Sequence, residues 1–245
     1  MISTNKPRII GYVPLMYGKE YLDACIRSMD PFVEVIHIFY VDKPSQGHGT
    51  DIPCPEGEQE LADIARAASN KIEWHKCVFG NEGEHRSEIF KYTEGFDLIL
   101  TLDADEVLEY HSTDISIREA FNGDRRYYGA TGFINFWRSF NEACYDGFTP
   151  IRLINLHNDS PYTGTIPMII YHFSCAQSET ITRYKWAISG HKDELRPDWV
   201  NSILYGTGKI DLHPVALGLW NATAFDRETL IPLLKSHPNY LKESI

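Results

Sequence analysis

The fold is decided by the stretch Phe96-Asp-Leu-Ile-Leu-Thr-Leu-Asp-Ala-Asp-Glu-Val-Leu108. Its apolar run over residues 98–102 predicts a strand buried on both faces of a parallel sheet. Asp103 and Asp105 follow at once, and side chains two residues apart on an extended chain project to the same side. Open α/β sheets bind ligands at the carboxyl ends of their strands, and a hard divalent cation takes carboxylate ligands while leaving positions for substrate phosphates. We therefore predict a metal site here, with a solvated acidic turn as the alternative.

Composition limits the classes of protein to consider. The 245 residues, 43% hydrophobic and 23% charged, suffice for one large domain or for one domain with an appendage. A net charge of −11 argues against sequence-independent binding of nucleic acid, although it leaves room for a local basic groove. Five cysteines without a Cys-x-x-Cys pair indicate reduced thiols. With no signal-peptide pattern and no apolar run of about 20 residues, a cytoplasmic protein without a membrane span is expected.

The first half alternates strand and helix patterns. Short apolar or alternating runs predict strands at residues 8–13, ended by Pro14, and at 33–41, 72–79 and 98–102. Apolar residues at helical spacing predict helices at 22–29 and 61–68, and a shorter helix is expected at 85–94. This β-α-β-α-β-α-β order is typical of a parallel sheet with right-handed crossovers.

The second half has a different pattern. Ser116-x-x-Glu119 is a capping-box sequence that predicts the start of a short helix. Strands are expected at 127–137, 151–155 and 168–173, then a helix beginning after Ser178 and a proline-bearing tail of loops and short helices. We expect one continuous domain, in which residues 1–110 form a nucleotide-binding α/β half and residues 111–245 bind the acceptor and complete the site.

Four segments in order resemble a known family. They are Ile10-Gly-Tyr-Val-Pro-Leu-Met-Tyr17 with Glu20-Tyr-Leu after it, Val41-Asp-Lys-Pro-Ser45, Asn81-Glu-Gly83 with Arg86, and the Asp-rich stretch. Together they resemble the first 110 or so residues of GT-A glycosyltransferases, in particular the family-2-like branch with its small bacterial and phage members. The resemblance implies an α/β fold, with a Rossmann-type, mostly parallel sheet flanked by helices and a C-terminal part of mixed strands and helices.

The resemblance also implies how a donor is bound. A nucleotide-sugar, with a UDP-sugar as the first expectation, would be held through Mn²⁺ or Mg²⁺. Asp105 would be the main metal ligand, and Asp103 would lie between the metal and the donor ribose. A cation at this place would stabilise the charge that develops on the diphosphate leaving group. Glu106 either orients a ligand or is an exposed acid.

Further donor contacts are expected around the first two strands. Asp42 would accept a hydrogen bond from the base, or is an ordinary turn residue. Tyr12, Pro14 and Tyr17 would stack on the base or complete the core. Arg86 would reach a phosphate, or pair with a neighbouring glutamate on the surface.

The C-terminal half carries a weaker match. Tyr171-His-Phe-Ser174, followed by Glu179-Thr-Ile-Thr-Arg-Tyr-Lys185 and Gly190-His-Lys192, resembles a segment in some small transferases in which a histidine precedes a basic helix. His172 would complete the metal shell as a neutral imidazole, or is a satisfied core histidine. Arg183 and Lys185 would neutralise the donor phosphates, or belong to a solvated helix face. His191 is a less favoured candidate.

An inverting transferase needs a carboxylate base for the acceptor hydroxyl, and the candidates are Glu142 and Asp146. The double-acid form of this motif is missing, as is the Gln-x-x-Arg-Trp sequence of processive synthases, so a non-processive hexosyltransferase-like enzyme is expected. Aromatic residues of the same region would form a platform for a sugar or base, or pack in the core: Phe136, Trp137, Phe140, Tyr145 and Phe148.

These observations predict a metal-dependent glycosyltransferase that moves a single sugar to an acceptor. The acceptor is open: a glycan, a protein, a metabolite or a modified nucleic-acid base. One alternative is a nucleotidyltransferase on a similar fold, disfavoured because its Gly-rich basic phosphate loop is represented only by Gly11, Gly18 and Lys19. Another is a non-catalytic nucleotide- or glycan-binding domain.

Overall fold

The computed structural model describes residues 6–44, 52–145, 147–190, 192–215 and 220–242. Ten strands form one sheet, in which β10-β7-β6-β8-β4-β1-β2-β3 are neighbours in that order and β9 joins β6 to β5. The strands are β1 Ile9–Leu15, β2 Val35–Val41, β3 Ile72–Cys77, β4 Leu98–Thr101, β5 Glu106–Leu108, β6 Tyr127–Trp137, β7 Glu142–Cys144, β8 Ile151–Asn155, β9 Thr163–Cys175 and β10 Ala222–Ala224.

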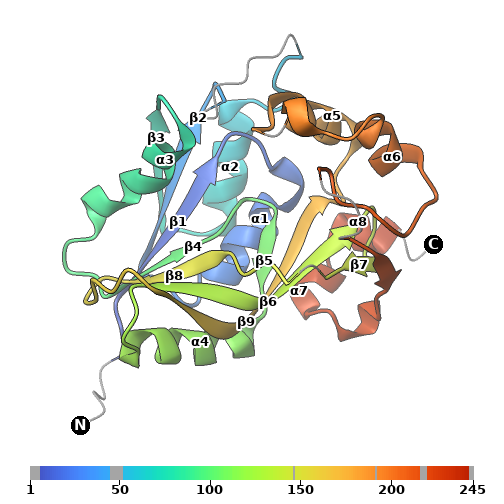
Figure 1. Cartoon of the computed structure of the whole chain (residues 1–245). Helices are drawn as coiled ribbons and strands as arrows, with labels where there is room; N and C mark the ends of the chain where they lie inside the picture. Colours follow the sequence, from blue (N-terminus) through green and yellow to red (C-terminus); the bar gives the residue numbers. More distant parts are fainter. Residues whose placement is uncertain (1–5, 45–51, 146, 191, 216–219, 243–245) are drawn as a thin grey trace.

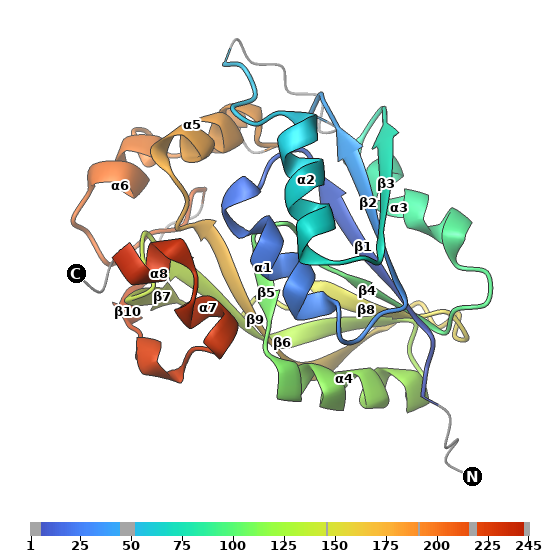
Figure 2. The ribbon, with the colours of Figure 1, turned by 180° about the vertical axis from the view of Figure 1, so that it is seen from behind.

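The first half of the chain builds the parallel part of this sheet. β3, β2, β1 and β4 lie side by side and run in the same direction. Helices α1 (Lys19–Met29) and α2 (Glu58–Ala68) cover one face (Figure 2), while α3 (Glu82–Ser87) and η1 (Glu88–Tyr92) lie on the other (Figure 1). Because β1, β2 and β4 are covered on both faces, they are almost wholly buried, as their continuous apolar runs predict.

The second half continues the same sheet in mixed orientation. β8 is antiparallel to β4 and to β6, while the long strand β9 runs parallel to β6. Helix α4 (Tyr110–Asn122) packs below β9 and β8 (Figure 1). The sheet is thus mixed as a whole, with helices on its faces, and the predicted α/β fold class is confirmed.

The C-terminal segments close one side of the sheet. They are α5 Glu179–Ile188, η2 Lys192–Glu194, α6 Trp199–Tyr205, η3 Arg227–Thr229, α7 Pro232–Lys235 and α8 Pro238–Lys242. His237, between α7 and α8, stacks on Tyr21 of α1 and bonds the carbonyl of Glu20. The tail is therefore the expected set of loops and short helices, and it is anchored to the first helix of the chain.

Local predictions failed at two places, and one strand was missed. β1 does not end at Pro14 but continues to Leu15, because its pairing with β4 stops at Tyr12 and no neighbour on that side requires the missing N–H. Ser116 does not cap a helix. It lies buried within α4, which begins at Tyr110, and the Glu109 carboxylate accepts the first backbone N–H groups instead.

The segment directly after the Asp-rich strand was assigned to no element. It forms β5, which pairs with β9 in antiparallel orientation. Glu106 is consequently buried rather than an exposed acid.

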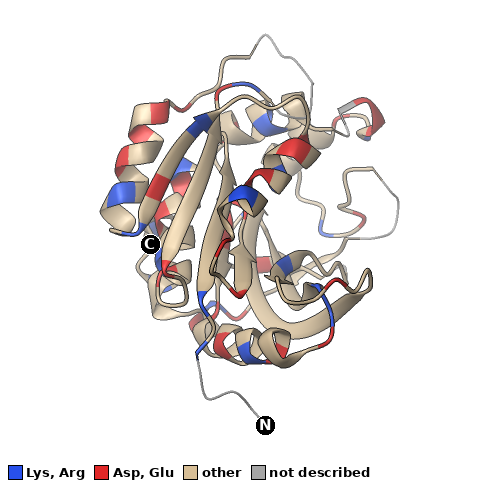
Figure 3. Ribbon diagram, turned by 90° about the vertical axis from the view of Figure 1, so that its left-hand side faces the viewer, with Lys and Arg blue, Asp and Glu red and all other residues tan. Residues whose placement is uncertain are grey.

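The surface and the thiols fit the composition. Acidic and basic residues are interspersed on the same helices in the view of Figure 3. All five cysteines have free thiols. In the part of the chain that the structure describes, no helix combines the length and apolar character needed to cross a bilayer.

Candidate functional site

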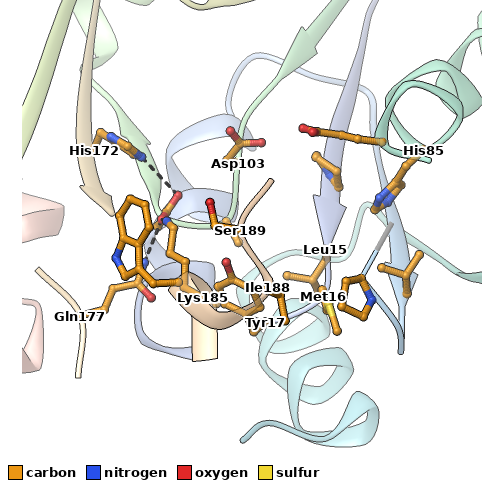
Figure 4. Close-up of a pocket in the computed structure, with 18 of the residues that line it drawn as sticks. Leu15, Met16, Tyr17, His85, Asp103, His172, Gln177, Lys185, Ile188 and Ser189 are labelled. Atoms are coloured by element: carbon orange, nitrogen blue, oxygen red, sulfur yellow. Dashed lines mark hydrogen bonds and ion pairs between the residues drawn. The ribbon is translucent and has the colours of Figure 1, made fainter. Parts of the chain in front are cut away.

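A cavity of about 510 Å³ lies at the carboxyl ends of β1, β2 and β4. The segment after β1 forms one wall, from Pro14 to Gly18, and the acidic segment after β4 forms another. Lys185 of α5 brings positive charge to the same cavity (Figure 4), and Arg86 of α3 also lines it. Residues from both parts of the chain therefore line this cavity.

The acidic segment is held by a close backbone contact with the start of α1. Gly18 has a φ of 143°, a conformation that residues with a side chain rarely adopt. A β-carbon at Gly18 would lie 2.6 Å from that of Ala104, which separates the two aspartates. The absence of a side chain at Gly18 thus lets the Asp-Ala-Asp turn pack against the helix.

Asp105 is the most enclosed carboxylate of the cavity wall. Its Oδ2 accepts hydrogen bonds from Lys185 Nζ at 2.9 Å and Gln177 Nε2 at 2.8 Å. Its Oδ1 lies 3.6 Å from His172 Nε2. Burial is the largest influence and raises the pKa of Asp105, but the charge of Lys185, its hydrogen bond and other nearby groups together outweigh burial, so the net pKa is lowered. Asp105 is therefore an anion with one oxygen committed to fixed partners.

His172 faces Asp105 as a neutral imidazole. Burial lowers its pKa to about 4. Its Nδ1 lies 2.6 Å from Oδ1 of Asn135, an oxygen that can only accept, so Nδ1 carries the proton. Nε2 then presents a lone pair toward the carboxylate of Asp105. Two electron-pair donors 3.6 Å apart repel each other, and a cation between them would remove that repulsion.

Asp103 is held by two arginines. Its Oδ1 accepts from Arg86 at 3.1 Å and its Oδ2 from Arg152 at 3.2 Å. Burial raises the pKa of Asp103, but the two guanidinium groups, Arg86 first, outweigh it and hold the pKa well below its usual range. Arg152 also forms a two-point ion pair with Glu106, with Nε to Oε2 at 2.6 Å. Burial raises the pKa of Glu106 to about 7.

The neighbouring strands β6 and β9 supply the polar floor. Side chains alternate between faces along a strand, and Asn135 pairs with His172 in the register of β6 and β9. Ser174, two residues beyond His172, bonds Lys185 Nζ at 2.6 Å. The intervening Phe173 stacks on Phe136 in the core on the opposite face. One face of this strand pair is thus built for the site and the other for packing.

The structure brings most of the predicted site residues to the cavity wall. They are Pro14, Tyr17, Arg86, Asp103, Asp105, His172 and Lys185. Tyr17 packs edge-on against Tyr184 beside the wall. Burial raises its pKa to about 12, so its hydroxyl stays protonated.

Four predicted residues are not part of this wall. Tyr12 is buried under it and donates its hydroxyl hydrogen to the carbonyl of His85. Asp42 lies 3.6 Å from Lys76 at the sheet edge. Arg183 pairs with Glu179 on the outer face of α5, and Glu142 on β7 pairs with Lys209. Asp146 and His191 lie outside the described residues.

Several site residues escaped the sequence analysis. Arg152 could have been found, because a charge within the apolar strand Ile151-Arg-Leu-Ile-Asn155 needs a buried partner. Ser174 and Gln177 carry no such signal, since their role depends on the packing of α5 over β9. Glu194 and His213 also line the cavity, from segments with no recognisable pattern.

Comparison with known proteins gives matches in structure only. Neither a family profile nor a curated protein matches the chain. The glucosyl-3-phosphoglycerate synthase of Mycobacterium tuberculosis, in complex with Mg²⁺ and uridine diphosphate, aligns at 12% identity and a TM-score of 0.38. The alignment covers 54% of this chain and 44% of that one. Residues 1–349 of S. aureus TarS align at 10% identity and a TM-score of 0.44, covering 81% of this chain and 70% of that one.

The chain spans less than half the length of the mycobacterial synthase. At such similarity the matches concern the fold, and the activity has to be argued from the residues of the cavity.

Proposed function

We propose that this chain is a metal-dependent glycosyltransferase that moves a single sugar from a nucleotide-sugar, in the first place a UDP-sugar, to an acceptor. The observation that carries the proposal is the pair Asp103 and Asp105 at the end of β4, in one cavity with the cations of Arg86 and Lys185. A cavity of about 510 Å³ suits a small-molecule ligand. Mixed charge of this kind suits a diphosphate accompanied by a divalent ion.

Asp105 and His172 are the residues that would hold the metal. Oδ1 of Asp105 and Nε2 of His172 face each other, and the bond from Asn135 orients the imidazole, as hydrogen bonds to metal-binding histidines usually do. Among the described residues no group of three or more His, Cys, Asp or Glu side chains is arranged around one ion. Two protein ligands suffice for Mg²⁺ or Mn²⁺ when phosphates and water supply the rest. When bound, the ion would stabilise charge on the departing diphosphate.

The chain's own groups would do the remaining work. Arg86 and Lys185 supply fixed positive charge toward the donor phosphates. Asp103, immobilised by Arg86 and Arg152, keeps a preorganised carboxylate at the edge of the cavity, where it would accept hydrogen bonds from the ribose. The apolar segment from Pro14 to Tyr17 would form the wall against the nucleoside.

The base for the acceptor hydroxyl would be a carboxylate near the open part of the cavity. Glu142 is engaged by Lys209 away from the wall, whereas Glu194 lines it. The candidates for the base are therefore Asp146 and, in addition, Glu194. Glu194→Gln and Asp146→Asn would distinguish them, because only the variant that lacks the base should lose sugar transfer while it still binds the donor.

The test is thermal unfolding with a panel of nucleoside diphosphates, with and without Mn²⁺. A ligand that binds only the native state at a hundredfold excess over its dissociation constant stabilises it by about 2.7 kcal/mol. One nucleotide should stabilise the protein in a metal-dependent manner, and Asp105→Asn should abolish the effect. Asp63→Asn, on the exposed face of α2, is the matched control.

Hydrolysis of the matching nucleotide-sugars would then identify the sugar. Binding of a nucleotide without any turnover would point to a binding domain instead. If a folded protein responds to no nucleotide in either condition, the proposal is wrong.

A further inference from the structure

A chain of aromatic rings leads from the cavity to the surface. The ring of Phe133 lies 4.7 Å from that of His172, centroid to centroid, at an interplanar angle of 30°. Phe148 meets Phe133 edge-on at 6.0 Å. Phe133 is only 7% exposed, whereas Phe148 is 60% exposed. A single exposed apolar side chain is common, but this one is joined through one ring to the proposed metal-binding histidine.

The sequence positions these rings by two simple means. Phe133, Asn135 and Trp137 are two residues apart in turn along β6, so their side chains project from the same face of the strand. Phe133 therefore lies beside Asn135, the residue that orients His172. Gly147 precedes Phe148 with a φ of 71°, and a β-carbon there would meet nothing within 4 Å. Gly147 thus has the left-handed backbone conformation that favours glycine, and the space beside it is open.

A polar group accompanies the rings. The Nδ2 of Asn135 is buried and has no hydrogen-bond partner among the described residues. A buried donor without a partner is costly, and a ligand hydroxyl or a water molecule would satisfy it. Asn135 is 5% exposed, so this donor lies beneath the surface, beside His172. The exposed ring of Phe148 is the part of this arrangement that can bind the apolar face of a hydroxylated ring.

We infer that Phe148 and Phe133 form the acceptor subsite and that the acceptor presents a carbohydrate ring. This inference rests on the proposed function, because the acceptor must bring a hydroxyl to the His172 end of the cavity while the nucleoside occupies the Pro14 to Tyr17 end. The C–H face of the ring would stack on Phe148. A nucleic-acid acceptor is disfavoured, because a chain of net charge −11 repels a phosphate backbone.

The experiment is saturation-transfer difference NMR with methyl glycosides of glucose, galactose, mannose and N-acetylglucosamine, in the presence of the stabilising nucleotide and Mn²⁺. At least one glycoside should bind, with the strongest transfer to the hydrogens of one ring face. Phe148→Ala should weaken binding about tenfold, and Phe148→Trp should retain it. Tyr162→Ala, which removes another exposed ring, should leave it unchanged.

The possible failures are distinguishable. Retained nucleotide stabilisation without glycoside binding, or with binding that Phe148→Ala does not alter, overturns the subsite and leaves the proposed transferase standing. If no nucleotide stabilises the native protein, the proposed function is wrong, and this surface is then not an acceptor subsite. Binding of cytidine or a short peptide in place of every glycoside would assign Phe148 to another class of ligand and overturn the inference.

Discussion

Each carboxylate that follows β4 has a cation of its own, and these cations come from distant parts of the sequence. Arg86 and Arg152 hold Asp103, Arg152 also holds Glu106, and Lys185 holds Asp105. The cluster is thereby charge-balanced without an added ion. Because Arg86 and Lys185 also line the cavity, they remain available to an incoming diphosphate.

Lys185→Met tests this availability. The methionine keeps most of the side-chain volume but removes the ammonium group from Asp105 and from the cavity. We expect the affinity for the nucleoside diphosphate to fall about 10- to 100-fold, which corresponds to about 1.4 to 2.8 kcal/mol. Calorimetric titration measures it, with Lys91→Met, an exposed lysine paired with Glu88, as the control. An affinity equal to that of the native protein would show that Lys185 serves only the fold.

The pair His37 and His75 makes a prediction about pH. The two rings share a hydrogen bond of 2.9 Å and stack on each other. Burial, and then the neighbouring His75, lowers the pKa of His37 from 6.5 to about 4. Between these values the unfolded chain binds a proton that the folded chain rejects, so the contribution to stability is present above pH 6.5 and is lost as the pH falls toward 4.

The loss should amount to about 2 kcal/mol, less than the full pKa shift corresponds to because the ring is only partly enclosed. Urea unfolding of the native protein and His37→Gln at pH 7, 6, 5 and 4 measures it, and the native protein's advantage should shrink toward pH 4. His111→Gln, on the exposed face of α4, is the control substitution. Parallel pH curves for native protein and His37→Gln would contradict the prediction.

At the scale of elements, periodicity located the helices and strands of the core but gave only some of their ends. Residues 127–137 and 151–155 were predicted with the bounds observed for β6 and β8, because an apolar run buried between neighbours leaves its pattern in the sequence. Ser116 was misleading, because the Glu109 carboxylate, about two turns earlier, caps the helix in place of the capping-box sequence. β5 was missed because its strand character comes from pairing with β9, about 65 residues away.

Arg138 fixes the end of another element that the sequence left undefined. It follows β6 with a φ of 63°, and its guanidinium donates to carbonyls at the end of α6, to Ser202 at 2.6 Å and Ile203 at 2.9 Å. A further bond goes to Gly206. The positive charge of Arg138 at these carbonyls also interacts favourably with the negative, C-terminal end of the helix dipole. Arg138 thus ties α6 to the edge of the sheet.

Arg138→Ala should lower the free energy of unfolding by about 2 to 3 kcal/mol, because charge-assisted bonds to several carbonyls are lost. Arg138→Gly loses the same bonds but relieves the left-handed backbone, so it should be about 1 kcal/mol less destabilised than Arg138→Ala. Urea unfolding compares the two, and hydrogen exchange should show the added opening at α6. An alanine variant as stable as the native protein would show that α6 is held by other contacts.

At the scale of the whole molecule, the site lies where the parallel half of the sheet meets the mixed half. The Asp-rich stretch alone predicted the strand end and its carboxylates, since both depend on local pattern. What it could not give was the identity of the partners: Arg152 arrives from β8, which pairs antiparallel with β4, and Lys185 arrives from α5 after β9. Such pairings depend on packing between residues some 50 to 80 positions apart, and they leave no periodic signal.

The buried pair of Arg152 and Glu106 should therefore couple the stability of the two halves. Their side chains are 9% and 1% exposed, respectively. Arg152→Met leaves Glu106 buried without its cation and removes one of the two arginines that hold Asp103, so unfolding should become easier by about 3 to 5 kcal/mol. In Arg152→Met with Glu106→Gln the uncompensated charge is gone, and about 1 to 3 kcal/mol should return. Arg118→Met, in an exposed pair with Asp114, should change stability by less than about 0.5 kcal/mol. Additive losses in the double variant would mean that Arg152 stabilises the junction through packing of its side chain, and that Glu106 contributes independently.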